Sequence, residues 1–418
     1  MKVFQAWGLF RTYLWIAWRN LMRNRRRSIL TFTTIALGLV VMIFSDGLMA
    51  GSEMDILYNL VRLQGGHVEI RVKPERERPL GASRLRPTEL DALIGRLEAH
   101  PSVDGVSPRI ILPGLATNNR TSRSVQVVAV EPEREKRVNS IVFQGSPQYL
   151  DATGGREALV GKPLAEALGL QTGDHLDLVI QGPAGATNVT FKVQAVYNTN
   201  FGEYDKSFVF IPLDQAQRLL FKGATNVAVL LNKPEEAPQL ARTIEGWAES
   251  AKIETPYEVV PWQEAQAAIL DALAAKNTTM ILLGGIIVLI AAFGVLNTML
   301  MSVYERVREI GVMMALGTKA REVVLLFLLE GFLMGAMGGF AGAFLGVALT
   351  GWMSTVGISL GNYSGVSNIP ISNVLYAQVI PSHVVVFALF VVLVAVASSL
   401  YPALSASRQQ PAQALRYV

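Results

Sequence analysis

Four long apolar stretches interrupt an otherwise mixed chain, at residues 28–50, 280–303, 324–352 and 383–403. Each supplies about the 20 residues that a helix needs to cross a hydrocarbon core roughly 30 Å thick. A soluble domain has no use for four such segments. The pattern therefore predicts an α-helical membrane protein with four transmembrane helices.

The segment between the first two predicted spans, residues 51–279, has a different pattern. Apolar and polar residues alternate, as in half-buried strands, at 66–73, 124–130, 188–197, 207–211 and 226–231. Helical spacing occurs at 88–98, 163–168, 213–220 and 236–249. We therefore expect this segment to form one large mixed α/β domain outside the membrane.

Two helices are expected to extend from the membrane toward this domain. Residues 263–303 contain no proline, and the helix-favouring run 264–276 continues into the second span. One helix over that range would be about 60 Å long at 1.5 Å per residue. Residues 52–63 could extend the first span in the same way. The pattern predicts paired helical stalks, and a flexible linker remains the alternative.

The distribution of charge predicts the orientation. Seven basic residues and no acidic one precede the first span, so the positive-inside rule places the N-terminus in the cytoplasm. The loop 304–323 is rich in arginine and lysine, whereas the loop 353–382 has neither, which places the first inside and the second outside. The α/β domain is then extracytoplasmic, and the tail 404–418 is cytoplasmic.

Residues 1–27 alternate aromatic, aliphatic and basic side chains at helical spacing. This pattern is typical of an amphipathic helix that lies on the inner membrane surface. A simple cytoplasmic extension of the first span is the alternative.

Composition narrows the possible functions. The net charge of +4 could indicate a nucleic-acid partner, but the basic residues gather beside the first span, so we expect no nucleic acid. There is no cysteine, and the four histidines lie far apart without ligand spacing, so no metal site is expected. The hydrophobic share of 51% fits the four spans.

No motif for ATP binding or catalysis is present. The closest approach to G-x-x-x-x-G-K-S/T is Gly161-Lys162, where Arg156 replaces the first glycine and Pro163 the hydroxyl residue. The chain is therefore predicted to be a non-enzymatic subunit with no cofactor of its own, and its energy must come from a partner.

The loop between the second and third spans carries E-R-V-R-E-I-G-V-M-M-A-L-G at residues 305–317. This motif resembles the FtsX-like permease domain of ABC transporters. Residues 158–174, A-L-V-G-K-P-L-A-E-A-L-G-L-Q-T-G-D, resemble the outer domain of the same FtsX-like and MacB-like permease family. The similarity covers nearly the whole chain and is greatest to the lipoprotein-releasing (LolC/LolE-type) permeases.

The resemblance implies that residues 304–323 are a coupling helix that sits in a groove of a separate ABC ATPase, which would bind ATP and Mg²⁺. It carries eight residues into that role: Glu305, Arg306, Glu309, Ile310, Gly311, Ala315, Leu316 and Gly317. Met314 departs from the family pattern, in which a basic residue is common there.

In this family the first span borders the cavity that accepts lipid-modified substrate, which makes Met42, Phe44 and Asp46 candidates for contact with substrate. Alternatively, Asp46 merely reaches headgroup water. Glu330 in the third span is a candidate for function or for snorkelling. The glycines of that span, at four-residue steps, are expected to serve helix packing.

The resemblance implies a permease subunit in the bacterial inner membrane that works by mechanotransmission. Its expected partners are an ABC ATPase, a second permease copy or paralogue, membrane lipid, and a periplasmic carrier, adaptor or hydrolase. Extraction of lipoproteins or other lipidic substrates is the leading hypothesis. A tripartite efflux permease and a non-transporting regulator of a cell-wall hydrolase are the alternatives.

Overall fold

The computed structural model describes residues 2–73, 84–118, 120–144, 150, 155–182, 185–247, 254–360, 372 and 374–409. It divides into two compact units, which are described separately. The helical unit comprises Met1–Ser52, Leu273–Ile358 and Tyr376–Val418, and the sheet unit comprises Glu53–Ala272 and Ser359–Leu375.

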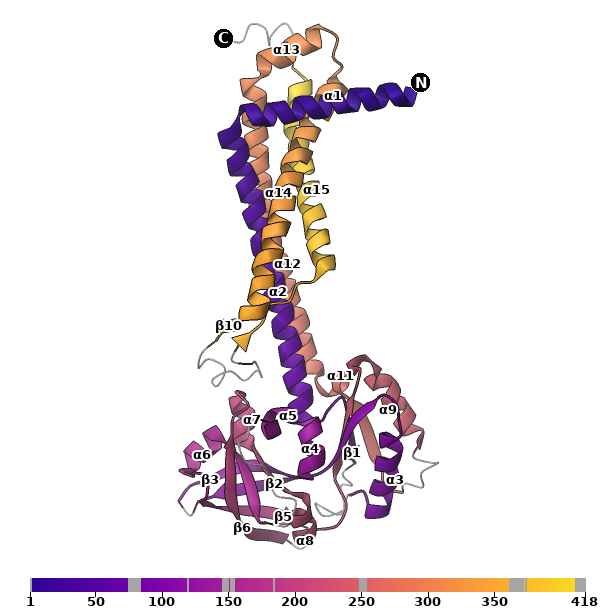
Figure 1. Ribbon diagram of the computed structural model, residues 1–418, viewed down its shortest axis with the longest axis vertical. Coiled ribbons are helices and arrows are strands. Elements are labelled where there is room, and N and C mark those ends of the chain that lie inside the picture. The colour runs from indigo at the N-terminus through magenta and orange to yellow at the C-terminus, as the bar shows by residue number, and fades with distance from the viewer. Residues whose placement is uncertain are drawn as a thin grey trace. The chain divides into compact units, whose positions relative to one another are not determined.

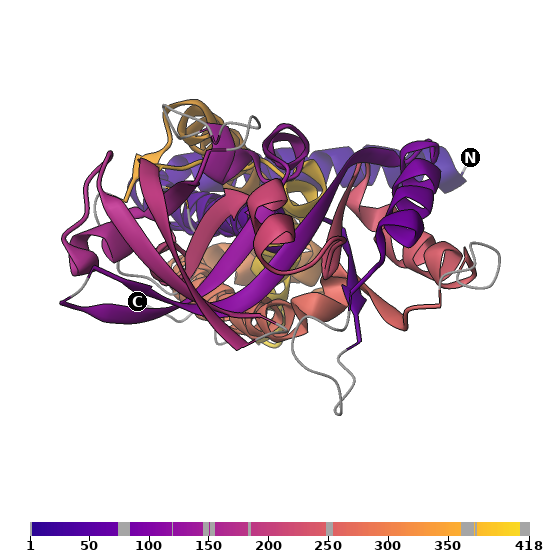
Figure 2. The ribbon, with the colours of Figure 1, turned by 90° about the horizontal axis from the view of Figure 1, so that it is seen from below.

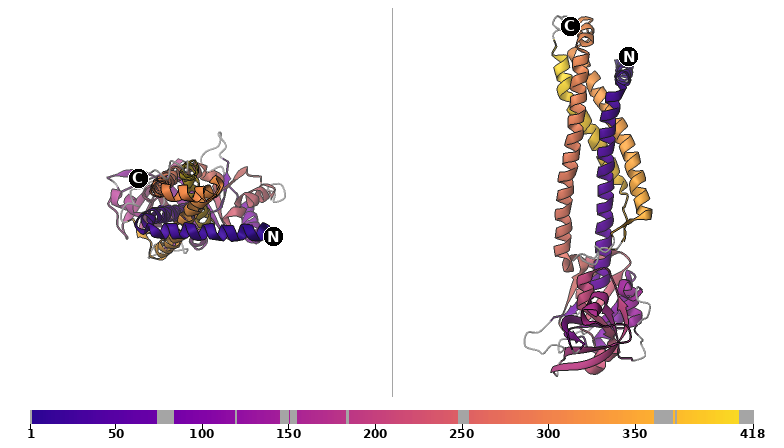
Figure 3. Two further views of the ribbon diagram at one scale, coloured as in Figure 1. Left: turned by 90° about the horizontal axis from the view of Figure 1, so that it is seen from above. Right: turned by 90° about the vertical axis from the view of Figure 1, so that its left-hand side faces the viewer.

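Six helices contribute to the helical unit: α1 (Lys2–Arg23), α2 (Arg25–Gln64), α12 (Ala267–Glu305), α13 (Val307–Ala315), α14 (Ala320–Val356) and α15 (Pro381–Ser407). Four of them, α2, α12 from Gly284 onward, α14 and α15, are long and apolar enough to cross a membrane. They run alongside one another, while α1 lies across the end that carries α13 (Figures 1 and 3). The four apolar stretches of the sequence fall within these four helices.

Glycines on α14 let its neighbours approach closely. A Cβ atom on Gly331 or Gly335 would collide with Ser399 or Ala395 of α15. On another face, a Cβ atom on Gly342 would lie 2.8 Å from the backbone oxygen of Ala36 in α2. The prediction that the glycines of this span serve helix packing is confirmed, since small residues allow backbones to approach where hydrophobic driving force is absent.

The helical extension of the first span is continuous, whereas that of the second span is broken at Gln266. The first span continues to Gln64, as expected, and the chain then turns at Gly66, whose φ of +73° favours glycine. The second stalk is not one helix from residue 263. A short helix, α11 (Trp262–Ala265), ends at Gln266 (φ −111°, ψ 21°), and α12 starts after it. The absence of proline did not reveal this break.

The N-terminal segment is separate from the first span. Helix α1 ends at Arg23, Asn24 forms a turn, and α2 begins at Arg25. The backbone N–H of Ser28 donates to the Asn24 oxygen across this turn. Of the predicted tail 404–418, residues 410–418 lie outside the described part of the chain.

The sheet unit is built on nine strands in the order β3-β7-β4-β6-β5-β2-β8-β1-β9. Their bounds are β1 Val68–Val72, β2 Val103–Thr117, β3 Ser122–Val130, β4 Glu157–Gly161, β5 His175–Gly182, β6 Gly185–Tyr197, β7 Phe208–Pro212, β8 Asn226–Leu231 and β9 Tyr257–Pro261. Since β3 also pairs with β2, the six strands from β3 to β2 close into a barrel. Strands β8, β1 and β9 form a wing beyond it.

Strand β2 joins the two parts because it is long enough to serve both. Its first half pairs with β8 of the wing, and its second half pairs with β5 of the barrel. Helices α3 (Pro87–Glu98) and α9 (Ala237–Glu245) cover the wing, on the side away from the barrel strands (Figure 2). The barrel and the wing have separate apolar cores, with Leu112, Leu178 and Phe191 in the first and Ile70, Leu93 and Leu240 in the second.

Short helices and bridges complete the described elements: α4 Pro132–Val138, α5 Ser140–Gln144, α6 Lys162–Leu168, α7 Gly202–Ser207, α8 Leu213–Leu219, η1 Pro234–Glu236, β10 Ile358–Ser359 and β11 Val374–Leu375. All five predicted strands and all four predicted helices of the outer segment correspond to elements here. Strands β2, β4, β5 and β9 were not predicted.

Candidate functional site

The motif at residues 305–317 forms a short helix with a defined beginning and end. Helix α12 ends at Glu305, and Arg306 leaves the helical conformation (φ −115°, ψ 14°) before α13 begins at Val307. At the other end Gly317 adopts a φ of +100°, and the N–H of Thr318 donates to the Met313 oxygen. Glycine suits this left-handed position because it has no Cβ. The motif therefore builds a jointed, capped helix.

The two faces of α13 separate the predicted contact residues. Val307, Ile310 and Gly311 face inward, and the Ile310 side chain is 1% exposed. Leu316 is 84% exposed and Val312 42% exposed. Of the eight residues, Glu305, Glu309, Ala315, Leu316 and Gly317 lie on the surface, whereas Arg306, Ile310 and Gly311 are buried. We name the exposed side, Arg308, Glu309, Val312, Ala315 and Leu316, the α13 face.

Val312 and Arg308 on this face were not predicted as contact residues. Val312 is exposed although it is apolar, whereas Val307 and Ile310 are buried. The spacing along the motif carries the missing signal: residues 305, 308, 309, 312, 315 and 316 recur every three or four positions, which is one side of a helix. An exposed leucine and valine beside charged residues suit a protein partner.

Ion pairs connect the acidic residues of the motif to the start of the chain. Arg27 forms two hydrogen bonds to the Glu305 carboxylate, at 2.9 and 3.1 Å, and Arg23 pairs with Glu309 at 3.0 Å. The Arg23 and Glu309 side chains are 52% and 54% exposed. Exposed pairs of this kind contribute at most about 1 kcal/mol, so a partner can replace them at little cost.

Arg306 is different, because it is buried and its contacts are internal. Its Nη1 donates to Glu330 Oε1 at 3.0 Å, and its Nη2 donates to the backbone oxygen of Asn20 at 3.0 Å. The Asn20 amide donates to the same Glu330 oxygen at 2.7 Å. We name Asn20, Arg306 and Glu330 the Arg306 cluster. Glu330 does not snorkel: it is 1% exposed and paired.

The Arg306 cluster borders a small polar cavity at the α13 end of the helical unit. Side chains from α1, α2, α12 and α14 line it, among them Asn24, Ser28, Thr298 and Ser302. Among the described residues, the buried Nε–H of Arg306 has no hydrogen-bond acceptor. A guanidinium with one free donor next to polar groups can exchange partners.

Asp46 lies about midway along α2. Its carboxylate is 2.9 Å from His383 Nδ1 at the start of α15, and both side chains are partly exposed. Asp46 was predicted to be a candidate for substrate contact, but its proximity to His383 was not predicted. Met42 and Phe44 are half-buried on the same helix, and the Met42 methyl faces Gly284 of α12. Contact of these residues with substrate stays a prediction.

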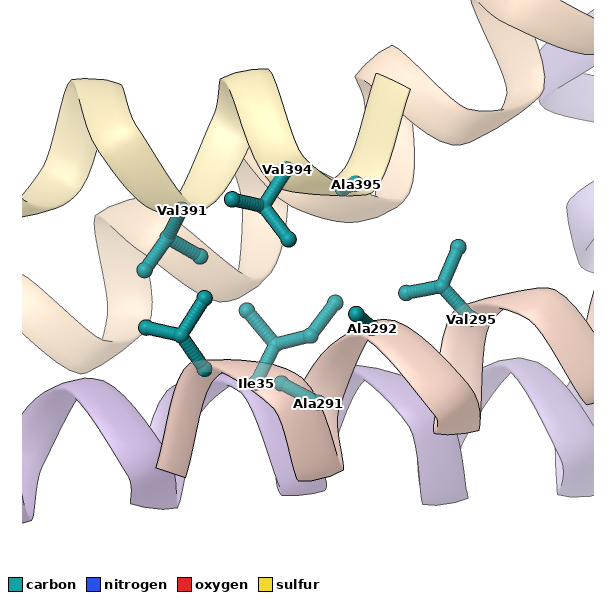
Figure 4. Close-up of a pocket in the computed structure, with 8 residues that line it drawn as sticks. Ile35, Ala291, Ala292, Val295, Val391, Val394 and Ala395 are labelled. Carbon is teal, nitrogen blue, oxygen red and sulfur yellow. The ribbon is translucent and has the colours of Figure 1, made fainter. Parts of the chain in front are cut away.

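A small apolar pocket lies deeper between α2, α12 and α15. Figure 4 shows Val391, Val394 and Ala395 of α15 pointing toward Ala292 and Val295 of α12, with Ile35 of α2 between them. The described side chains that line it are all apolar. Such a lining offers nothing to recognise a polar ligand.

In the sheet unit, the end of α2 is anchored by a second buried ion pair. Arg109 donates through Nη1 to the Gln64 oxygen at 2.5 Å, while its Nε and Nη2 donate to both Glu135 oxygens at 3.0 and 2.6 Å. The Tyr204 hydroxyl donates to the Leu63 oxygen at 2.7 Å. These donors satisfy carbonyls that a helix C-terminus leaves free. Burial disfavours the charge on Arg109, but the Glu135 carboxylate outweighs it and raises the Arg109 pKa.

Within the described part of the chain, no group of three or more histidines, aspartates or glutamates could hold a metal ion.

Family models cover most of the chain. Residues 28–246 match the MacB-like periplasmic core domain, and residues 281–411 match the FtsX-like permease C-terminal model. The chain is 25% identical over 423 residues to the lipoprotein-releasing system transmembrane protein LolC of Xylella fastidiosa, covering 96% of this chain and 98% of that protein. It is 26% identical over 434 residues to LolC of Neisseria meningitidis, covering 98% and 100%.

A third relative is of a different kind. The macrolide export ATP-binding/permease protein MacB of Rhodospirillum rubrum is 25% identical over 348 residues, which cover 79% of this chain and 51% of that protein. About half of that MacB protein, whose name includes ATP binding, therefore has no counterpart in the aligned part of this chain.

Proposed function

Because the chain belongs to the family of ABC transporter permeases with a MacB-like periplasmic core domain and an FtsX-like permease domain, we propose that its α13 face docks a separate ABC ATPase. The observation that carries this proposal is the α13 face itself, where Leu316 is 84% exposed beside Glu309 and Val312. An apolar centre with a charged rim is the usual anatomy of a protein interface.

The orientation follows from the same proposal. The ATPase is cytoplasmic, so α13 and both chain ends are cytoplasmic, and the sheet unit is periplasmic in a bacterial inner membrane. The basic residues before α2 and in the α13 loop support this, since positively charged loops stay on the cytoplasmic side. A second permease, identical or related, completes the complex.

We propose release of lipid-modified proteins or related lipidic substrates as the task. The two lipoprotein-releasing relatives align with this chain over 98% and 100% of their own length, which supports the proposal. The long helix α2, of 40 residues, reaches from the apolar bundle into the sheet unit and ends on buried donors of that unit. Such a helix can pass mechanical displacement to a periplasmic domain.

Docking is tested by co-expressing the chain with ABC ATPases of the same genome and purifying the complex in detergent. Glu309→Lys reverses a charge on the α13 face, so we expect at least about a tenfold loss of ATPase affinity, or about 1.4 kcal/mol. The protein should remain inserted in the membrane. Wild-type affinity in this variant would contradict the assignment of the α13 face.

A matched control separates docking from the internal ion pair. In Arg23→Glu/Glu309→Lys the pair is reversed and can form again, because the two side chains are 3.0 Å apart in the wild type. If the pair alone matters, the double variant regains affinity. If Glu309 contacts the ATPase, the double variant stays defective.

The transport task is tested separately in proteoliposomes that contain the complex and a purified triacylated lipoprotein. ATP should release the lipoprotein to a soluble acceptor, and a macrolide should not be exported. Release without ATP, or ATP-driven movement of the macrolide only, would reject this substrate class while leaving the docking result intact.

A further inference from the structure

The Arg306 cluster joins α1, the joint before α13, and α14, and only Asn20 is distant in the chain, 286 residues from Arg306. Asn20 belongs to α1, Arg306 lies in the joint between α12 and α13, and Glu330 lies in α14, ten residues beyond its first residue. At 1.5 Å per residue, the carboxylate is about 15 Å along that helix. A single guanidinium therefore bridges the joint of α13 to two neighbouring helices.

Arg306 lies where the helical backbone is interrupted between α12 and α13. Its non-helical backbone (φ −115°, ψ 14°) separates α13 from α12, so a push on α13 need not be passed along α12. Its side chain, however, holds Glu330 and Asn20. The ion pair thus adds a side-chain link from this joint to α14, beside the turn 316–319 that joins α13 to α14 and the apolar cluster that Ile310 shares with Phe327.

The contacts of Arg306 are incomplete, in the manner of a group that changes partners. One Glu330 oxygen, Oε1, accepts from both Arg306 and Asn20. The buried Nε–H of Arg306 has no acceptor among the described residues, and the adjoining cavity is lined by Ser302, Thr298 and Asn24. Buried donors are nearly always paired, so an exception in a cavity indicates a second arrangement or a bound water.

We propose that Arg306 is a positioning residue that couples movement of α13 to α14 and α1 through Glu330 and Asn20. The Arg306 cluster is not part of the docking surface, because Arg306 is 4% exposed. The inference rests on the proposed docking of an ATPase at the α13 face, and it assigns to Arg306 a role after docking. Variants should therefore dock normally and fail to transmit.

The test uses the complete permease–ATPase complex in lipid nanodiscs. The chain has no cysteine, so spin labels can be placed at Trp352→Cys in α14 and Ile286→Cys in α12, both more than half exposed. Their distance is measured without nucleotide and after trapping with ADP and vanadate. In the otherwise wild-type protein we expect a shift of α14 relative to α12.

The decisive variant is Arg306→Met/Glu330→Gln, which removes the ion pair without leaving a buried charge. The amide oxygen introduced by Glu330→Gln still accepts from Asn20, and the fold is preserved, because replacing both members of a buried pair is often neutral. We expect unchanged co-purification of the ATPase and a nucleotide-dependent shift reduced at least about fivefold, within the usual range of coupling. An unreduced shift would overturn the proposal.

A second variant gives an answer even if the first is unstable. Arg306→Lys keeps the charge near Glu330 but cannot hold two partners with a planar fork. We expect it to keep part of the shift through its remaining ion pair with Glu330, while Arg306→Met alone loses it. An unreduced shift in Arg306→Met would also overturn the proposal. Failure of the unmutated chain to bind any ATPase would instead reject the proposed docking.

Discussion

Within the described part of the chain, two arginine–glutamate pairs have both side chains buried, and the two are built differently. Arg109 and Glu135 in the sheet unit are joined by two hydrogen bonds, which the Nε and Nη2 atoms of Arg109 donate to the two carboxylate oxygens. Glu135 also accepts a hydrogen bond from Ser107 at 2.6 Å. Arg306 and Glu330 in the helical unit share one hydrogen bond, and Arg306 Nε has no acceptor among the described residues.

The difference separates a fixed joint from an adjustable one. A bidentate pair has one favoured geometry, so Arg109 fixes the carbonyl end of α2 in the sheet unit. A pair joined by one hydrogen bond, with a second donor left without an acceptor, fixes its geometry less strictly. The outer end of α2 is therefore expected to move with the sheet unit as one body, while the α13 end can rearrange during an ATPase cycle.

The largest expected effect comes from breaking the fixed joint. Arg109→Met leaves Glu135 buried at 0% exposure without a counter-charge and frees the Gln64 oxygen. We expect a loss of about 3–5 kcal/mol in the free energy of unfolding of the sheet unit. Thermal unfolding in detergent, followed by circular dichroism, measures it.

The matched control is Arg109→Met/Glu135→Gln. It removes both charges, so we expect it to recover more than half of the lost stability. If it is as unstable as the single variant, the side-chain volume of Arg109 matters more than its pairing, and the contrast between the two joints is wrong.

A smaller effect is expected from pH, and it acts on the sheet unit near the same helix end. His67 follows Gly66, its Nδ1 accepts from the Leu231 N–H at 2.9 Å, and burial, helped by Arg62, lowers its pKa to about 4. The neutral form is therefore favoured in the folded state. Its stabilisation is present above the unfolded pKa of 6.5 and is lost as pH falls through about 4.

The difference between a pKa of 6.5 and one of about 4 corresponds to about 3 kcal/mol at most. The free energy of unfolding of the wild type should decrease as pH falls from 6.5 to about 4, and His67→Gln, which keeps an acceptor without titrating, should flatten that part of the profile. An identical profile in the variant would show that other groups carry the acid sensitivity.

The smallest effect is expected at the other end of the helical unit. Asp46 and His383 are 29% and 49% exposed, so Asp46→Asn should change the unfolding free energy by at most about 1 kcal/mol. Gly51→Ala nearby should cost more, because its Cβ would collide with the Tyr376 backbone oxygen. If Asp46→Asn lowers the free energy of unfolding more than Gly51→Ala does, the ion pair contributes more than close packing to the stability of this part of the helical unit.

Much of this molecule could be predicted from local pattern. Each span is a long, mostly apolar run, and the A-L-G ending of the motif locates the end of α13, where Gly317 adopts a positive φ. The alternating strands of the outer segment were found for the same reason. Such features depend only on neighbours in the sequence.

Features that depend on distant partners were not predicted. The barrel closes because β2 pairs with β3, β5 and β8 at once, which no alternation reveals. Arg306 looked like one more charge of a surface helix, and its burial depends on Glu330 and on Asn20, which lies 286 residues away. The break at Gln266 carries neither glycine nor proline.

The central claim, that the α13 face contacts an ABC ATPase, is tested most directly by site-specific photo-crosslinking. Leu316→Cys, in a chain without other cysteines, is labelled with a benzophenone maleimide in native membranes and irradiated. Tyr376→Cys, 50% exposed in the segment before α15, is the control. The account predicts an adduct with an ABC ATPase from position 316 and none from position 376. An ATPase adduct from position 376, or none from position 316, would contradict it.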